Sequence, residues 1–152
     1  MIRPAIQQDM DAIMALWLVS TTEAHPFISS HYWRESEAVV RDTYLPHALT
    51  WVAENDGEIV GFISVLEMQF IGALFVDKRF HGKGIGPLLM QHVKMIFPQL
   101  MLEVYTENQR ALRFYRHEGF EIQDTQLNED TQHMTAIMLW EKRPGAWLED
   151  ED

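Results

Sequence analysis

The 152-residue sequence contains no cysteine, which excludes disulfides, thiolate-bound metals and a cysteine nucleophile. It also has no apolar run that approaches the roughly 18 residues of a membrane-spanning helix. The N-terminal segment, MIRPAIQQDMD, lacks the basic stretch and apolar run of a secretion signal. These absences predict a soluble cytoplasmic protein with no membrane partner.

Basic residues are scarce, since 12 lysines and arginines are outnumbered by 23 aspartates and glutamates, which gives a net charge of −11. Proteins that neutralise nucleic-acid phosphates normally have a broad basic face, so no nucleic-acid partner is expected. An acidic surface suits a cationic substrate such as an amine. The seven histidines do not form the i, i+4 pairs near a carboxylate that bind zinc in metalloproteases, so no metal site is expected.

Apolar residues make up 47% of the chain, enough to build a core, and a single domain over residues 1–152 is expected, with an acidic tail at 145–152. Hydrophobic periodicity and turn residues predict a mixed α/β (α+β) fold in the order β-α-α-β-β-β-α-β-α-β-β. The predicted helices cover residues 8–20, 30–45 (stopping at Pro46), 87–97 and 109–118. The predicted strands cover residues 2–6, 50–53, 58–66, 67–76, 100–105, 120–127 and 131–140.

The stretch LFVDKRFHGKGIGPLL, from Leu74 to Leu89, predicts a strand, a glycine-rich loop and the start of a helix. Glycines at alternate positions allow φ > 0 and let backbone N–H groups approach a ligand. The first turn of a helix has unpaired N–H groups and about half a positive charge, so a phosphate binds well there. A basic cluster on this loop also favours an anion over the alternative of a solvated turn: Lys78, Arg79, His81 and Lys83.

The loop His81-Gly82-Lys83-Gly84-Ile85-Gly86 resembles the acyl-CoA loop Q/R-x-x-G-x-G/A of the GNAT superfamily of N-acetyltransferases, with histidine in the first position. Further segments are similar to the small bacterial YiaC- and YjaB-type acetyltransferases, namely TTEAHPFI from Thr21, YWR from Tyr32, LEVY from Leu102 and FY at 114–115. The resemblance implies the GNAT fold, with a central sheet of about seven strands flanked by about four helices. It implies acetyl-CoA as cosubstrate, bound by Leu74, Phe75, Val76, His81, Gly82, Lys83, Gly84, Ile85, Gly86, Pro87, Asn108 and Tyr115.

Two residues are candidates for the chemistry of acetyl transfer to an amine. Glu103 alternates with Leu102 and Val104 along a strand, and an apolar environment would raise its pKa and suit it as a base; the alternative is a glutamate at an exposed strand end. Tyr115 has the Phe-Tyr context in which the family uses tyrosine as the acid. Without the resemblance, the sequence would indicate a core aromatic residue. For Asn108 the alternative is a helix cap.

The sequence also offers candidate residues for the site that binds the acceptor amine. An acidic and aromatic wall would suit a lysine side chain through charge and cation–π contact, although core packing explains the aromatics equally well. The candidate residues are Thr22, His25, Phe27, Trp33 and Glu67. The expected function is direct acetyl transfer to a protein lysine, by a monomer or homodimer. The alternatives are a small amine (a polyamine or aminoglycoside) and a non-catalytic acyl-CoA-binding module.

Overall fold

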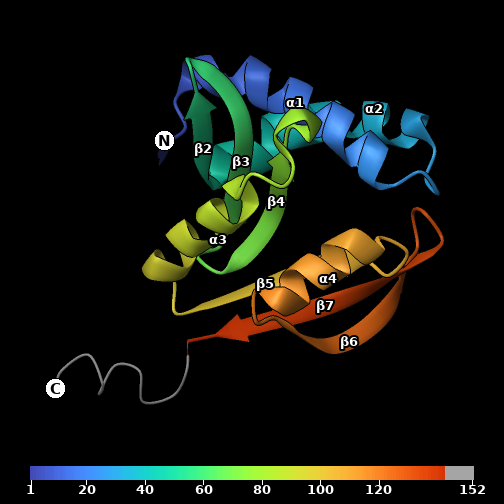
Figure 1. Ribbon diagram of the computed structural model, residues 1–152. Coiled ribbons are helices and arrows are strands. Elements are labelled where there is room, and N and C mark those ends of the chain that lie inside the picture. The colour runs from blue at the N-terminus through green and yellow to red at the C-terminus, as the bar shows by residue number, and fades with distance from the viewer. Residues whose placement is uncertain (143–152) are drawn as a thin grey trace, which may run out of the picture.

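The computed structural model describes residues 1–142 (Figure 1). The predicted order of helices and strands and the mixed fold class are confirmed, whereas the predicted acidic tail at 145–152 lies outside the described residues. The α-helices are α1 (Met10–Ala24), α2 (Ser30–Val39), α3 (Ile85–Ile96) and α4 (Gln109–His117). The strands are β1 (Ile2–Pro4), β2 (Leu49–Asn55), β3 (Glu58–Leu66), β4 (Phe70–Val76), β5 (Gln99–Tyr105), β6 (Glu121–Asn128) and β7 (His133–Glu141).

All seven strands form one sheet in the order β1-β2-β3-β4-β5-β7-β6. Every neighbouring pair is antiparallel except β4 and β5, which are parallel and share a single register pair, Phe70 with Met101. The sheet therefore has two halves, β1 to β4 and β5 to β6, which diverge beyond that pair (Figure 1).

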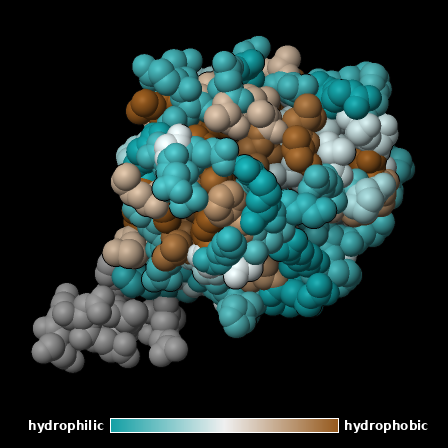
Figure 2. Space-filling view, turned by 45° about the horizontal axis from the view of Figure 1, so that its top comes forward, coloured by the Kyte–Doolittle hydropathy of each residue, from teal (hydrophilic) through white to brown (hydrophobic). Residues whose placement is uncertain are grey.

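Strand alternation divides the core between the two faces of the sheet. Val52 and Phe62 face α1 and α2, where they pack with Ile13 and Trp17. The strand residues on either side of Val52 and Phe62 point the opposite way, toward α3. They form a second apolar cluster, which extends to α4 through Leu112. The face shown in Figure 2 has apolar side chains in its middle, with hydrophilic side chains around them.

The predicted helix over residues 30–45 is wrong in its second half. The α-helix ends at Val39, a π-helix covers Val40–Tyr44, and a 3₁₀ turn covers Leu45–His47. Pro46 lies inside that turn instead of stopping the helix before it. Proline is tolerated in a first helical turn because its missing N–H would have had no partner there.

The predicted strand over 67–76 is too long, since β4 begins at Phe70. Glu67 and Met68 have φ values of 52° and 64° and form the turn between β3 and β4. Neither residue type signals such a conformation, which usually takes glycine or asparagine. By contrast, the predicted turn of the β2–β3 hairpin is confirmed at Asp56 and Gly57, with φ values of 50° and 80°.

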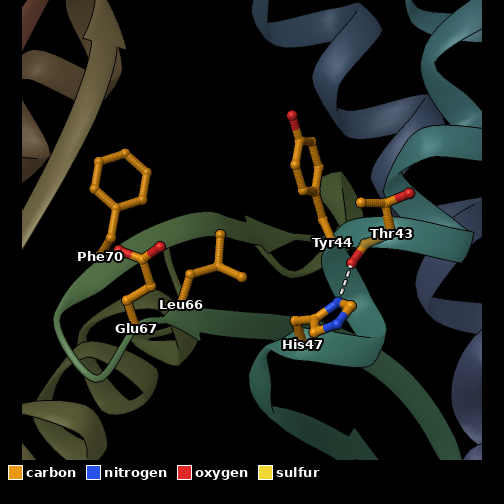
Figure 3. Close-up of a pocket in the computed structure, with 6 residues that line it drawn as sticks. All are labelled: Thr43, Tyr44, His47, Leu66, Glu67 and Phe70. Carbon is orange, nitrogen blue, oxygen red and sulfur yellow. Dashed lines mark hydrogen bonds between the residues drawn. The ribbon is translucent and has the colours of Figure 1, made fainter.

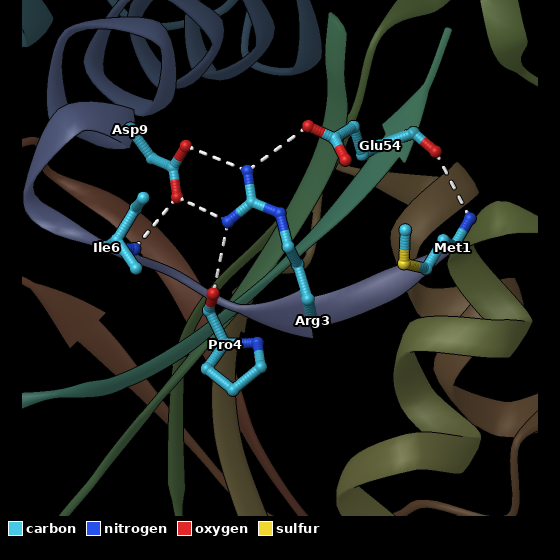
Figure 4. Close-up of polar contacts among 6 residues, drawn as sticks. All are labelled: Met1, Arg3, Pro4, Ile6, Asp9 and Glu54. Carbon is cyan, nitrogen blue, oxygen red and sulfur yellow. Dashed lines mark hydrogen bonds and ion pairs between the residues drawn. The ribbon is translucent and has the colours of Figure 1, made fainter. Parts of the chain in front are cut away.

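A polar network attaches β1 to the start of α1 (Figure 4). The guanidinium of Arg3 donates to both carboxylate oxygens of Asp9, at 2.8 and 3.0 Å, and to Glu54 at 3.3 Å. Asp9 is buried and also accepts a hydrogen bond from the Ile6 N–H at 2.8 Å. The hydrogen bonds from Arg3 hold the pKa of Asp9 below its ordinary value. The network orients the N-terminal strand.

Candidate active site

The central feature of the site is the opening between β4 and β5. At its closed end, the Met101 N–H donates to the Gln69 carbonyl at 2.8 Å, and the Gln99 and Gln69 side chains bond at 2.7 Å. Beyond Phe70 the two strands share no register pair, so the edge of β4 that faces β5 has unpaired backbone groups. A cavity of about 180 Å³ occupies this opening, lined by Phe70, Ile71, Gly72, Glu103, Tyr105, Asn128 and Thr135.

The glycine loop follows the far end of β4. Gly82 and Gly84 have φ values of 78° and 85°, and Gly84 directly precedes α3, which begins two residues earlier than predicted. Pro87 lies in the first turn of α3, as expected. In the described part of the chain, the N–H groups of residues 82–86 have no hydrogen-bond partner, whereas the Leu88 N–H donates to the Gly84 carbonyl at 3.1 Å. The loop thus presents several free amides at the positive end of a helix, as an anion site requires.

The predicted basic cluster on this loop is neutralised in part, at Arg79. Arg79 donates to Asp77 at 2.8 Å and to Glu58 at 2.7 Å, and the hydrogen bonds from Arg79 lower the pKa of Asp77. Lys78 and Lys83 form no ion pair with a residue in 1–142, and Lys83 lies over the Phe80 ring, 5.4 Å from its centroid. Two lysines, not the whole cluster, are therefore available to an anion.

His81, at the variable first position of the loop motif, folds back onto β4. Its Nε2 lies 2.8 Å from the carbonyl oxygen of Val76, and the distance implies that Nε2–H donates. The Val76 carbonyl, an expected contact of pantetheine, therefore already has one partner. A carbonyl oxygen has two lone pairs, so a second hydrogen bond remains available to it.

Helix α4 adjoins the loop. A Cβ placed on Gly86 would lie 3.5 Å from the Phe114 ring and 4.0 Å from Val76, so the start of α3, the end of β4 and α4 meet here. Tyr115 is half-buried, packs against Phe114 and Phe120 at ring distances of 5.3 and 5.7 Å, and its burial raises the pKa of the phenol. Its hydroxyl makes no hydrogen bond within the described residues, so it is free to meet a ligand.

Asn108 caps α4, because its Oδ1 accepts a hydrogen bond from the Ala111 N–H at 3.2 Å. The helix-cap interpretation of this residue is confirmed. Its side-chain nitrogen has no hydrogen-bond partner within residues 1–142, so a contact with the cofactor stays a prediction.

Glu103 lies on the predicted face of β5, but the apolar environment predicted for it is wrong. Its carboxylate is exposed and accepts hydrogen bonds from Thr135 Oγ1 at 2.6 Å and Gln126 Nε2 at 3.1 Å. These polar partners come from β7 and β6, which pair with β5 or with each other. They fix the orientation of the carboxylate at the wall of the cavity.

Three of the five predicted acceptor residues come together beside β5. His25 lies 5.1 Å from Trp33 and 5.2 Å from Tyr105, and Phe27 lies 5.7 Å from Tyr105, between ring centroids. Burial lowers the pKa of His25, so its ring is neutral at pH 7, with Nδ1 2.6 Å from the Thr21 carbonyl. The indole N–H of Trp33 is buried and has no partner among the described residues.

The other two predicted acceptor residues lie elsewhere. Thr22 is half-buried on α1 and its hydroxyl makes no hydrogen bond within residues 1–142, and Glu67 lines a separate cleft (Figure 3). Tyr105 and Thr135 were missed as site residues. The alternation that places Glu103 and Tyr105 on one face of β5 could have indicated Tyr105, whereas Thr135 depends on the pairing of β5 with β7.

None of the helices in residues 1–142 is long and apolar enough to cross a membrane. The same part of the chain contains no group of three or more histidine or acidic side chains placed to hold a metal ion.

Known proteins resemble this chain in sequence and in fold. Residues 10–120 match the model of the acetyltransferase (GNAT) family. Peptidyl-lysine N-acetyltransferase YiaC of Escherichia coli is 48% identical over 92% of this chain and 96% of its own. The solution structure of apo YjaB from Escherichia coli has a TM-score of 0.80 at 29% identity and covers 94% of this chain and 98% of its own. PaiA N-acetyltransferase from Thermoplasma acidophilum, solved with coenzyme A, has the same fold, with a TM-score of 0.80 at 19% identity over 93% of this chain and 98% of its own.

Proposed function

The chain belongs to the acetyltransferase (GNAT) family, and from this we propose that it transfers the acetyl group of acetyl-CoA directly to lysine side chains of proteins. The family match and the relatives confirm the predicted resemblance and the class of enzyme, an N-acetyltransferase. The acceptor is a proposal, supported by the similarity to YiaC and by the acidic net charge of −11.

The observation that carries the proposal is the open edge of β4, which leads to a loop of free amides. The diphosphate of acetyl-CoA would bind the amides of residues 82–86, with Lys83 nearby to add positive charge. The pantetheine arm would run along Leu74, Phe75 and Val76 as an added strand does and hydrogen-bond to the backbone groups of Leu74 and Val76, which point away from β3. This path directs the thioester into the opening between β4 and β5.

An alkylamine with a pKa near 10.4 is mostly protonated at neutral pH and cannot attack. Glu103, oriented by Thr135 at the cavity wall, would accept the proton directly or through water. The amine nitrogen then attacks the thioester carbonyl carbon, its second proton passes to water, and the tetrahedral intermediate collapses to the amide with cleavage of the C–S bond. No acyl-cysteine can form, since the chain has no cysteine.

The departing sulfur needs a hydrogen-bond donor as charge develops on it. Tyr115 suits this role because its raised pKa keeps the phenol protonated and its hydroxyl has no partner within residues 1–142. Tyr115 would donate a hydrogen bond to the sulfur and then the proton of the thiol product. Proton exchange with water restores Tyr115 and Glu103 after product release.

The acceptor would approach the opening past His25, Phe27 and Trp33, whose rings gather around Tyr105. His25 and Trp33 are buried, whereas Phe27 and Tyr105 are partly exposed, and an exposed aromatic face favours a cationic side chain by about 0.5–1 kcal/mol. The buried N–H of Trp33 is a donor that an acceptor carbonyl or a water molecule could satisfy. Thr22 stays a predicted contact of the same approach.

The test measures free thiol released from acetyl-CoA with lysine peptides, a polyamine and an aminoglycoside as acceptors. We expect release with the peptides, and Tyr115→Phe should lower kcat by roughly 100-fold or more because it removes only the hydroxyl. Coenzyme A affinity should be retained, since the ring still packs against Phe114 and Phe120. The control is Tyr32→Phe, which removes the hydroxyl of another partly buried tyrosine.

The outcomes separate the alternatives. Thiol release with the small amines alone would contradict the protein acceptor and leave the enzyme class in place. Thermal stabilisation by coenzyme A without thiol release from any acceptor would support an acyl-CoA-binding module instead.

A further inference from the structure

A larger cavity, with a volume of about 560 Å³, adjoins the opening between β4 and β5, because Phe70 lines both. Thr43, Tyr44 and His47 form one side, from the segment after α2, and Leu66, Glu67 and Phe70 form the other, from the β3–β4 hairpin. Figure 3 shows the rings of Tyr44 and Phe70 on opposite sides, with Leu66 between them and the carboxylate of Glu67 beside Phe70. We call these six residues the hairpin cleft.

The lining of the hairpin cleft suits a cation with an aliphatic stem. Two aromatic faces attract a guanidinium or ammonium group, Leu66 offers apolar contact to its methylenes, and Glu67 supplies the opposite charge. No lysine or arginine of residues 1–142 lines the cleft, and the whole chain carries a net charge of −11. The Glu67 carboxylate and the Tyr44 hydroxyl form no hydrogen bond or ion pair with any residue in 1–142, so both are available to a ligand.

The backbone conformation is unusual on both sides of the cleft. Glu67 and Met68 have φ values of 52° and 64°, conformations that cost energy for residues other than glycine. The β2–β3 hairpin of the same chain has positive φ at Asp56 and Gly57, residue types that suit such a turn. On the opposite side, the segment Val40–Tyr44 is a π-helix, a rare form that is frequent at functional sites. The turn therefore keeps a costly backbone conformation at the position where it presents the Glu67 carboxylate to the cleft.

Resting on the proposed acetyl transfer to protein lysines, we propose that the hairpin cleft binds an arginine or lysine side chain that lies close to the acceptor lysine in the substrate polypeptide. The acceptor lysine enters the cavity beside Glu103, and the polypeptide continues past Phe70, which both cavities share. A second basic residue within a few positions then places its charged group between Tyr44 and Phe70, next to Glu67. The cleft selects substrates by the sequence around the lysine.

The experiment uses peptides with a single lysine and either arginine, alanine or glutamate at the flanking positions. We expect kcat/KM to be about fivefold higher with arginine than with alanine, the size of an exposed cation–π contact together with a surface ion pair, and lowest with glutamate. In Glu67→Gln and Tyr44→Ala the ratio of arginine to alanine should fall toward one. The matched control is Glu121→Gln, which removes one exposed carboxylate on β6 that does not line the cleft and should keep the ratio of the unaltered protein.

A binding measurement tests the cleft without turnover. A peptide with arginine retained and the lysine replaced by norleucine is titrated into the labelled protein saturated with coenzyme A. The amide NMR signals of residues 43–45, 47 and 66–70 should shift, and should shift less in Glu67→Gln.

The outcomes distinguish the two proposals. Equal kcat/KM for the three peptides, or a preference for the glutamate peptide, overturns the role of the cleft and leaves acetyl transfer to lysine in place. Absence of peptide acetylation overturns the proposed function. The NMR titration then tests independently whether the cleft binds a basic side chain. Unchanged signals at 43–45, 47 and 66–70 overturn the binding of a basic side chain there.

Discussion

Replacing Gly84 by alanine tests the central feature of the cofactor site, the left-handed conformation that precedes α3. Gly84 has φ of 85°, and a Cβ built on it would meet no heavy atom of residues 1–142 within 4 Å. The substitution therefore adds no clash and changes only the conformational preference of the backbone. An L-residue pays roughly 1–2 kcal/mol to stay in the left-handed region.

This cost must appear in one of two measurable quantities. If the loop keeps its conformation, the free energy of unfolding falls by about 1–2 kcal/mol, which lowers Tm by roughly 2–8 °C for a chain of this size. If the free loop relaxes and must be restored on binding, the affinity for coenzyme A falls instead, by roughly 5- to 30-fold. The two losses together should amount to about 1–2 kcal/mol.

The control is Gly57→Ala in the β2–β3 hairpin. Among the described residues, a built Cβ on Gly57, which has φ of 80°, likewise meets no heavy atom within 4 Å. Gly57 therefore carries the same backbone cost outside the glycine loop. We expect Gly57→Ala to lower Tm without changing coenzyme A affinity. Thermal unfolding and calorimetric titration with coenzyme A measure both quantities for each variant. If Gly84→Ala lost neither stability nor affinity, or if Gly57→Ala weakened coenzyme A binding equally, the assignment of this loop as the diphosphate site would be wrong.

Two further predictions concern carboxylates. Glu103→Gln retains an acceptor for Thr135 but cannot take a proton, so kcat/KM should fall by roughly 100-fold; a change of less than about twofold would assign deprotonation of the amine to a water path. Asp9→Asn should lower Tm at pH 7, because the charged pair with Arg3 is lost (Figure 4). Since the folded-state pKa of Asp9 lies below its ordinary value of 3.8, this contribution is present above about pH 4 and disappears as the pH falls through the folded-state pKa. The Tm difference from the unaltered protein, of roughly 3 °C at pH 7, should therefore shrink below pH 4, and a difference that stays constant down to pH 2 would contradict the role of Asp9.

The order of the secondary structure could be predicted because its signals are local. Alternating apolar residues indicated the strands, and Asp56-Gly57 indicated the first hairpin turn. The errors occurred where no local signal existed. Glu67 and Met68 form a turn with residue types that disfavour it, and the helix after Ser30 changes to a π-helix at Val40 without a proline or glycine.

The candidate site was predicted unevenly for the same reason. The glycines of the loop and Pro87 are found where the sequence placed them, at the start of α3. Arg79 pairs with Asp77, two positions away, which the local sequence could have indicated, and with Glu58, 21 positions away, which it could not. Likewise Glu103 meets Thr135 and Gln126 only because β5, β7 and β6 are neighbours in the sheet.

The sequence by itself determined the family, the order of the elements and the strand-loop-helix unit with its glycines, since each depends on residues that are close together in the chain. Only the tertiary structure decided that β4 and β5 diverge after one register pair, that His25, Phe27 and Trp33 gather around Tyr105, and that Glu67 lies in a cleft of its own. These arrangements depend on how distant strands and helices pack against one another, and packing between distant segments follows from the whole core and not from any single stretch of sequence.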